Sequence, residues 1–379
     1  MPWWSYLPLA IWILWVFTFG LGLGSFLNVL IARLPFEKSV IWPGSRCGAC
    51  LQPLRLTDNL PIIGYLRLRG RCRSCGVHFS SRYLWVELLT GLAFVVLFLI
   101  EIVFNFHEVP KFKIGLLAGV DPTPPIEAWF TFLIHGILLA LLIAASVIDL
   151  HYKIIPTQIT VFGTLFGLAA STLFPWPWPC SPSDIPNIPN LDSWADPRIA
   201  GRIPIGLAMW PFWGPLPSWA PAGSPQLGFL TSLIGAAVGQ MIVRVVKYLF
   251  EVGFGKEAIG LGDADLLMMV GAFLGWQPVV LSFFVGACIL LPVEILRRLW
   301  MWLMKRPPSE DGAIPFGPGL AAGVVVTWLG WPILGMLVQV AFFLEILLAT
   351  MVVIMFGGLL GAGVLMSFIR GGHAEEPKS

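Results

Sequence analysis

The sequence predicts an all-α fold, a polytopic bundle of eight or nine transmembrane helices with a small cytoplasmic zinc-binding domain between the first two. Composition indicates a membrane protein, because 57% of the residues are apolar and 12% are charged. Soluble domains carry roughly a quarter charged residues. Apolar runs of about 20 residues, the length that crosses a bilayer, recur along the chain. Four cysteines in two closely spaced pairs follow the first run.

The distribution of basic residues orients the spans. No Lys or Arg precedes the first apolar run and Arg33 follows it, so we expect a retained helix with its N-terminus outside rather than a cleaved signal. Nine spans threaded from that start place 19 of the 23 Lys and Arg residues on the cytoplasmic side, as the positive-inside rule requires. The short run at 264–277 decides between eight and nine spans. The apolar runs lie at 7–31, 84–104, 128–149, 159–174, 227–249, 264–277, 279–300, 317–336 and 340–368.

These patterns divide the chain into parts. Pro removes a backbone donor and restricts its neighbour, so we expect the Pro- and Trp-rich outer loop to be an irregular spacer at the membrane interface. No basic run is interleaved with aromatic residues, which excludes nucleic acid as a partner. The predicted parts are a first transmembrane helix (1–31), a cytoplasmic four-cysteine domain (32–83), a transmembrane core (84–368) with the outer loop at 175–226, and a polar cytoplasmic tail (369–379).

Two CxxC pairs, Cys47-Gly-Ala-Cys50 and Cys72-Arg-Ser-Cys75, lie in the segment assigned to the reducing cytoplasm. Each such turn directs two thiolates at one ion, and two turns complete the tetrahedral shell of a structural zinc. A segment of about fifty residues with little apolar content also needs a metal, because it cannot build an adequate core. The alternative is a set of free thiols or a redox disulfide.

Four cysteine ligands would leave no position open for water, so the zinc is expected to hold the fold and not to take part in catalysis. The remaining two cysteines, Cys180 and Cys288, are far apart in the predicted topology. We expect both to be unpaired.

Two aspartates lie where predicted helices meet the cytoplasm, and membrane carboxylates are functional candidates because they are costly to bury. Asp149 ends an apolar helix shortly before Pro156. Asp263 follows Gly260 and Gly262, which permit a tight backbone just before the next helix. Taken alone, Asp149 could be a solvated helix end and Asp263 an ordinary N-cap. Together, at the same depth on the same side, they favour a catalytic pair.

Two carboxylates that share a proton can hydrolyse a peptide bond, one taking a proton from the attacking water while the other donates to the carbonyl oxygen or leaving amine. Our hypothesis makes Asp263 the initial base, because a helix N-terminus favours its ionised form. Asp149 is then the initial acid, because a helix C-terminus favours the protonated form, although Lys153 opposes this.

Two other acids in the apolar runs are expected to have structural partners. Glu87 begins the second span and is expected to pair with Arg82. Glu294 lies about one helical turn from Arg297 and Arg298 and is expected to form a salt bridge.

Six motifs, in order, resemble those of the bacterial type IV prepilin peptidases, also called leader peptidase and N-methyltransferase, a family of membrane aspartic proteases with a Gly-x-Gly-Asp signature. The resemblance covers nearly the whole chain and includes the two aspartates, the glycines of the catalytic loop and the CxxC pairs. The matching segments are GSFLNVLIARLP (24–35), DNLPIIGYLRLRGRCRSC (58–75), SRYLWVELLTG (81–91), IDLHYKIIP (148–156), GLGDADLL (260–267) and IPFGPGLAAG (314–323).

The resemblance implies cleavage of short basic leader peptides from type IV prepilins or type II secretion pseudopilins at the cytoplasmic face of the bacterial inner membrane. It also implies methylation of the new N-terminus with S-adenosylmethionine, for which no binding residues can be named. Zn²⁺ is the expected structural ion. The pilin-like substrates and the lipid bilayer are the expected partners, and the oligomeric state stays open.

Some positions differ from the family pattern. His151 and Thr157 stand where family members often have Asp, and Asp265 stands where Lys is common. Asp in place of Lys would raise the apparent pKa of the catalytic pair if Asp265 faced the site. The run GLGLGS (20–25) superficially resembles a nucleotide-binding loop, but it lies in a predicted transmembrane helix with no preceding strand. We therefore expect it to be a helix-packing face.

Two other functions remain open. One is a Gly-x-Gly-Asp protease that acts on other membrane-anchored substrates without methylation. The other is a transporter that uses the aspartates as proton sites. A transporter needs carboxylates near the bilayer midplane, whereas these are predicted at its inner edge.

Overall fold

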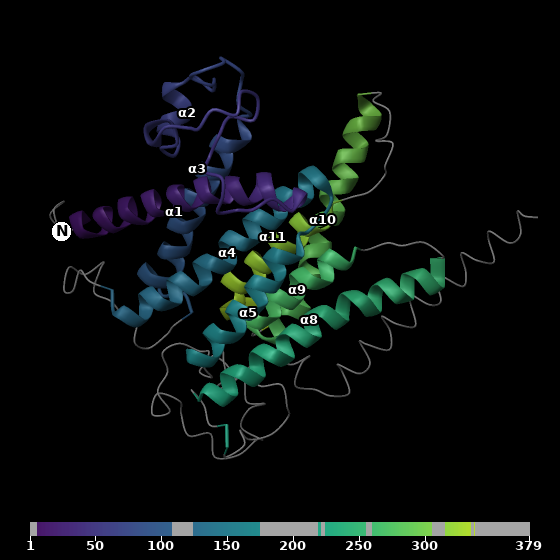
Figure 1. The fold of residues 1–379 in the computed structure, drawn as a ribbon. Helices are drawn as coiled ribbons and strands as arrows, with labels where there is room; N and C mark the ends of the chain where they lie inside the picture. Colours follow the sequence, from purple (N-terminus) through teal and green to yellow (C-terminus); the bar gives the residue numbers. More distant parts are fainter. Residues whose placement is uncertain are drawn as a thin grey trace, which may run out of the picture. The chain divides into compact units, whose positions relative to one another are not determined.

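The computed structural model describes residues 6–107, 124–174, 219–220, 224–254, 260–304, 315–334 and 337. Every regular element within these residues is a helix, and the four cysteines lie between the first two long helices, which confirms the predicted fold (Figure 1). The chain forms two compact units, one mainly from residues up to Ile159 and the other mainly from Thr160 onward. Most of the predicted outer loop, the apolar run at 340–368 and the tail at 369–379 lie outside the described residues.

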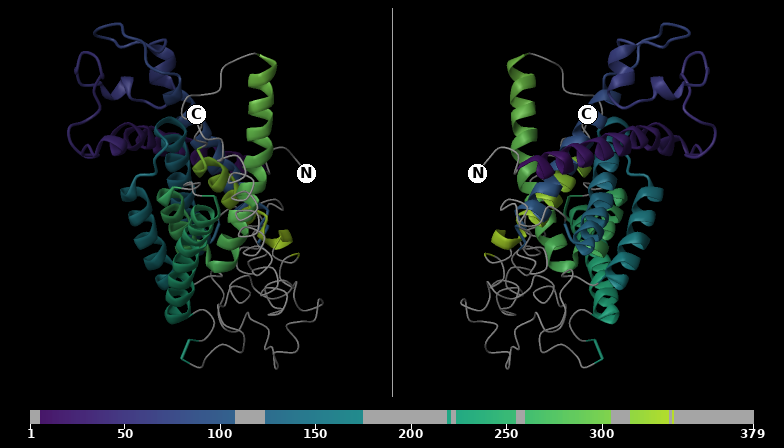
Figure 2. Two further views of the ribbon diagram at one scale, coloured as in Figure 1. Left: turned by 90° about the vertical axis from the view of Figure 1, so that its right-hand side faces the viewer. Right: turned by 90° about the vertical axis from the view of Figure 1, so that its left-hand side faces the viewer.

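Long apolar helices and a loop-rich segment make up the first unit. Its elements are α1 (Leu7–Arg33), η2 (Leu34–Phe36), η3 (Leu56–Asp58), α2 (Ile63–Arg67), α3 (Arg82–Phe98), the π-helical turn η4 (Leu99–Val103) and α4 (Ile126–Tyr152). α1 packs along α3, and both helices contact α4. Figure 2 shows the segment between α1 and α3 as loops with short helical turns. α4 ends where Lys153 takes the left-handed conformation and donates its N–H to the carbonyl of Asp149.

Helices also make up the second unit. Its elements are α5 (Thr157–Leu173), α8 (Pro225–Phe254), α9 (Leu261–Leu274), α10 (Trp276–Leu303) and α11 (Gly317–Leu329). α8 packs along α9, and α10 packs along α11. Gly275 separates α9 from α10, because its φ of 83° is incompatible with a continuing helix. The apolar run predicted at 264–277 is therefore interrupted before its end.

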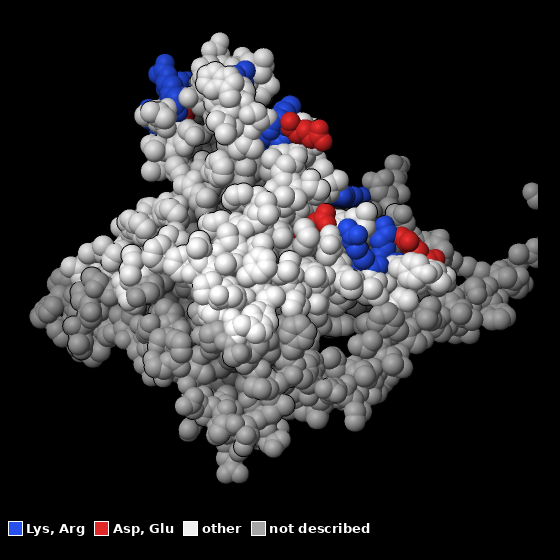
Figure 3. Space-filling view, turned by 60° about the horizontal axis from the view of Figure 1, so that its bottom comes forward, with Lys and Arg blue, Asp and Glu red and all other residues white. Residues whose placement is uncertain are grey.

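The described helices have the length and composition expected of a membrane protein. Five of them could cross a bilayer: Leu7–Phe36, Arg82–Val103, Ala128–Tyr152, Pro225–Val252 and Trp276–Leu303. Two shorter apolar helices, Thr157–Leu173 and Gly317–Leu329, accompany them. The face shown in Figure 3 is largely uncharged where it is described, and its charged side chains gather in a few clusters. The polytopic character is thus confirmed, and the choice between eight and nine spans stays a prediction.

Glycines let α1 and α3 approach closely. A Cβ at Gly20 would lie 2.9 Å from the Cα of Gly91, and a Cβ at Gly24 would lie 2.7 Å from the Cα of Glu87. A Cβ at Gly22, on the same helix, would meet nothing within 4 Å. The run GLGLGS is therefore a helix-packing face, as predicted, with Gly20 and Gly24 on the side toward α3.

Gly24→Ala is expected to destabilise the protein by about 1–3 kcal/mol, because the added methyl group forces α1 and α3 apart. Gly22→Ala adds the same group where space is open, so its stability should match or slightly exceed that of the wild type. Thermal unfolding in detergent micelles measures both. Equal melting temperatures for the two variants would contradict the close contact at Gly24.

α9, the helix that carries Asp263, is tightly fixed in the second unit. A Cβ at Gly271 of α9 would overlap the backbone of α8. The hydroxyls of Ser171 on α5 and Ser232 on α8 both donate to the carbonyl of Ala272, at 3.0 and 2.7 Å. Three helices therefore meet at one carbonyl, which sets the position of α9 and so of the aspartate in its first turn.

Candidate functional site

Among the described residues, four cysteines are the only group of three or more side chains placed to bind a metal. The sulfurs of Cys47, Cys50, Cys72 and Cys75 all lie within 4.8 Å of one another. The Sγ atoms of Cys47 and Cys75 are 3.8 Å apart, and those of Cys50 and Cys72 are 3.9 Å apart. A tetrahedral ion with Zn–S bonds of about 2.3 Å holds its sulfurs about 3.8 Å apart. The four predicted ligands therefore come together, and two of their sulfur–sulfur distances match a tetrahedral shell.

The two cysteine pairs lie in turns with the same backbone pattern. In each turn the first cysteine donates its N–H to the carbonyl five residues further on. Its own carbonyl accepts the N–H four residues further on, from Leu51 to Cys47 and from Gly76 to Cys72, both at 3.0 Å. Leu51 and Gly76 share a left-handed backbone, with φ of 57° and 72°. Because one turn is used twice, the two pairs present their thiols in equivalent ways.

Backbone N–H groups favour the thiolate form of the first cysteine in each pair. The Cys75 N–H is the largest contributor that lowers the pKa of Cys72 to about 6. The Cys50 N–H similarly lowers the pKa of Cys47. The Gln52 N–H lowers the pKa of Cys50, but burial and the neighbouring cysteines outweigh it and raise that pKa to about 11. A divalent cation among the four sulfurs would favour the thiolate at every position.

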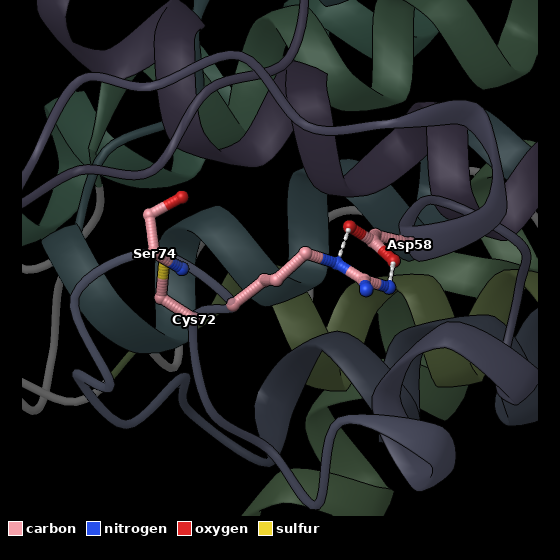
Figure 4. A network of polar contacts seen from close by, with 4 residues as sticks. Asp58, Cys72 and Ser74 are labelled. Atoms are coloured by element: carbon pink, nitrogen blue, oxygen red, sulfur yellow. Dashed lines mark hydrogen bonds and ion pairs between the residues drawn. The ribbon is translucent and has the colours of Figure 1, made fainter.

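Two carboxylates fasten this segment. Asp58 of η3 accepts two hydrogen bonds from the guanidinium of Arg73, one of them from Nε at 2.9 Å (Figure 4). Arg73 belongs to the second cysteine turn. The guanidinium lowers the pKa of Asp58. Glu87 of α3 accepts the N–H of Ile62, just before α2, at 2.7 Å. The cysteine segment is thus tied both internally and to α3.

The prediction that Glu87 pairs with Arg82 is wrong. The guanidinium of Arg82 lies over the ring of Tyr83, 5.4 Å from its centroid, and the Glu87 carboxylate bonds to the backbone of the cysteine segment instead. The expected pairing rested on sequence proximity along one helix. The sequence did not reveal that the cysteine segment folds back onto α3 and supplies the Ile62 N–H as the partner of Glu87.

Glu87→Leu is expected to loosen α2 by about 1–3 kcal/mol, because the Ile62 N–H loses its acceptor. Hydrogen exchange of the amides in 60–68 measures this and should accelerate. Glu87→Gln retains an acceptor oxygen of similar reach and serves as the matched control, with exchange close to the wild type. Unchanged exchange in Glu87→Leu would contradict the fastening role.

Asp149 lies in the last turn of α4 and is 6% exposed. Its neighbours Leu150 and His151 are exposed, so the carboxylate occupies the protected side of the helix end. His151 uses its Nδ1 in a contact with the carbonyl of Val147, at 2.9 Å. The alternative of a solvated helix end does not fit such burial, because a carboxylate is buried only at a substantial free-energy cost.

Asp263 lies in the first turn of α9 and is 7% exposed. The N-cap of that helix is Gly260, so Asp263 does not have the ordinary N-cap position considered above. Its Oδ2 lies 3.5 Å from where a Cβ on Gly260 would stand. A Cβ there would make ordinary van der Waals contact with the carboxylate.

Asp149 and Asp263 belong to different compact units. Within the second unit, Asp265 accepts a hydrogen bond from Gln240 of α8, at 3.3 Å. This contact gives the Asp265 carboxylate a hydrogen-bond partner on the neighbouring helix. The side chains at the other two positions that differ from the family pattern, His151 and Thr157, are exposed.

A buried pair of titratable side chains was not predicted from the sequence. Glu101 of η4 contacts Nδ1 of His135 on α4 through Oε1 at 2.6 Å, and the two side chains are 2% and 3% exposed. π-Helical turns such as η4 occur frequently at functional sites. His135 precedes Asp149 by about 21 Å along α4, from the helical rise, so the pair is separate from that carboxylate.

The predicted salt bridge of Glu294 is confirmed, with both carboxylate oxygens on Arg297 at 2.6 and 2.8 Å.

Two family models match the chain. The model of the bacterial peptidase A24 N-terminal domain matches residues 18–100, which include the four cysteines. The model of the type IV leader peptidase family matches residues 201–295, which include Asp263. Asp149 lies between the two matched stretches.

Curated relatives with one shared name are similar to the chain. A prepilin leader peptidase/N-methyltransferase of Myxococcus xanthus (strain DK1622) is 32% identical over 262 residues, which are 69% of this chain and 56% of that protein. Proteins of the same name from Aeromonas salmonicida (strain A449) and Dickeya chrysanthemi are 29% and 27% identical over 339 and 352 residues. These matches cover 81% and 84% of this chain and 86% and 94% of the relatives. No solved structure matches the chain.

Proposed function

Because the chain belongs to the type IV leader peptidase family, we propose that it removes leader peptides from type IV prepilins or type II secretion pseudopilins and methylates the new N-terminal amine. The observation that carries the proposal is the match to the Dickeya chrysanthemi protein, which covers 94% of that relative. The name of that relative, which this chain matches over nearly its whole length, includes both activities. The distribution of basic residues supports the cytoplasmic face of the bacterial inner membrane as the place of cleavage.

Asp149 and Asp263 are the proposed catalytic pair. Asp263, ionised, takes a proton from water as the water oxygen attacks the scissile carbonyl carbon, while Asp149 donates its proton to the carbonyl oxygen. When the C–N bond breaks, the leaving amine takes the proton from Asp263 and a hydroxyl of the intermediate returns one to Asp149. Burial of both carboxylates supports these roles.

The cysteine cluster is proposed to hold one structural Zn²⁺. Its ligands would be Cys47, Cys50, Cys72 and Cys75, and their spacing supports a closed tetrahedral shell with no position for water. S-adenosylmethionine is the proposed methyl donor, and the amine released by cleavage is the acceptor. No residue of this chain is assigned to the methyl donor.

Incubation of the purified full chain with a prepilin-like substrate tests the proposal, with mass spectrometry as the readout. We expect loss of the leader peptide and, when S-adenosylmethionine is added, one further methyl group on the new N-terminus. Cleavage without methylation would favour the Gly-x-Gly-Asp protease that lacks the second activity. Failure to cleave any prepilin-like or pseudopilin-like substrate, with the chain folded and its metal bound, would overturn the proposal.

A further inference from the structure

One guanidinium holds the loop 39–44 in shape. The loop follows η2 and precedes the first cysteine turn. The Trp42 N–H adds a contact to the Ser39 hydroxyl, at 3.3 Å. Arg33, the last residue of α1, donates to four loop carbonyls at 2.6 to 3.2 Å: those of Ser39, Val40, Pro43 and Gly44. The backbone is therefore fixed on both sides of the residues at its centre.

This ordered loop presents two adjacent apolar side chains to the outside. Ile41 is 91% exposed and Trp42 is 78% exposed. Their exposure is a property of a fixed backbone, because the Arg33 contacts hold the chain that carries them. Apolar area kept in water gains nothing from the hydrophobic effect until another apolar phase covers it.

The loop lies at the end of two candidate spans. Arg33 belongs to the last turn of the span Leu7–Phe36, and its side chain reaches both arms of the loop, so Ile41 and Trp42 lie close to the end of that span. The ring of Phe36 packs on Tyr152, the last residue of α4, with 5.5 Å between centroids. Trp is enriched at this level of a bilayer, where its amphipathic ring lies among the headgroups.

The charges around the loop complement an anionic surface. Lys38 and Arg46 flank the loop, and both are exposed. The segment 32–83 carries nine Lys and Arg residues against two acids, and one of those acids, Asp58, is engaged by a guanidinium within the segment. Each basic residue near an anionic membrane surface raises binding by about fivefold.

We propose that the loop 39–44 is an interfacial anchor for anionic phospholipid: Ile41 and Trp42 insert among the headgroups, and Lys38 and Arg46 bind the lipid phosphates. The anchor goes beyond the proposed peptidase function and does not depend on it. A protein partner fits less well, because two side chains offer far less than the roughly 800 Å² per partner of a stable interface. The packing of Phe36 on the end of α4 places this lipid contact in the neighbourhood of the helix end that carries Asp149.

Photocrosslinking on the full chain tests the anchor. Trp42 is replaced by p-benzoylphenylalanine, and the protein is reconstituted in nanodiscs of phosphatidylcholine alone or mixed with phosphatidylglycerol. Mass spectrometry is expected to find lipid adducts at position 42, with phosphatidylglycerol preferred. Lys38→Gln with Arg46→Gln should lower that preference by about fivefold for each charge removed. Arg55→Gln with Arg71→Gln removes the same charge elsewhere in the segment and should leave the preference intact.

Each of the following results would overturn one part of the anchor proposal. The absence of lipid adducts in both nanodiscs overturns insertion, and equal yields in both overturn anionic recognition. Equal effects of the two double variants would attribute the preference to net charge instead of the loop. Crosslinks to an added prepilin in place of lipid would assign the loop to protein binding. Metal content and thermal unfolding verify each variant, and slower amide exchange of 39–44 in the wild type with phosphatidylglycerol provides a test that needs no substitution.

Discussion

Asp149→Asn and Asp263→Asn are each expected to lower the rate of leader-peptide cleavage by about 10²–10⁴-fold, the usual contribution of a general acid or base. Asn preserves the size of the side chain and its ability to accept a hydrogen bond, but it cannot exchange a proton with water or substrate. Both carboxylates are buried, so exchange of protons with bulk water is not expected to replace them fully. The measurement is kcat for a prepilin-like substrate in detergent or nanodiscs.

Asp265→Asn is the matched control for this prediction. It lies two residues beyond Asp263 on the same helix, and Asn there can still accept the hydrogen bond from Gln240, so cleavage should stay near the wild-type rate. The variant that lacks both Asp149 and Asp263 should be about as inactive as either single variant, because residues that act as a unit are not additive. Wild-type cleavage by either single variant would exclude the pair, and an equal loss in Asp265→Asn would point to a structural effect.

The sequence predicted the positions of helices correctly where the length of an apolar run alone determines where a helix lies. The run predicted at 128–149 corresponds to α4, which extends from Ile126 to Tyr152. The run at 264–277 was placed less well, because the break at Gly275 depends on a backbone angle of 83°. Hydropathy does not report backbone angles. The apolar pattern runs on without a break through the junction between α9 and α10, so it cannot locate that junction.

Site residues followed from the sequence where local spacing determines their geometry. The CxxC pairs are such a case, since each turn is complete within six residues and its thiols converge as predicted. The contacts between Glu101 and His135, and between Glu87 and Ile62, join positions 34 and 25 residues apart. They arise from how η4 packs with α4 and how α3 packs with the cysteine segment, which no local pattern encodes. The pairing of Asp149 with Asp263 is likewise non-local, and the Asn variants are its direct test.

Cys47→Ser and Cys72→Ser are each expected to abolish metal binding and to unfold the cysteine segment. Structural zinc contributes about 10–16 kcal/mol to the folding of small zinc peptides, and the described segment offers little else. Its regular structure is limited to the short helix α2 and the 3-10 turn η3, with a few polar side-chain contacts. Its apolar side chains are largely exposed. Metal analysis should fall from one zinc per chain to nearly none, and amide exchange across the segment should become fast.

Cys288→Ser is the control, because that cysteine is exposed on α10 and lies in the other unit; it should keep its metal and its exchange pattern. Retention of one zinc per chain in Cys72→Ser would contradict the four-cysteine site. The alternative of a redox disulfide predicts a different result, since the sulfurs at 3.8 and 3.9 Å could also pair with each other on oxidation. Thiol labelling of the denatured wild type distinguishes the two. A zinc site yields four additional reactive thiols once a chelator is present without reductant, whereas two disulfides would yield none from this cluster until a reductant is added.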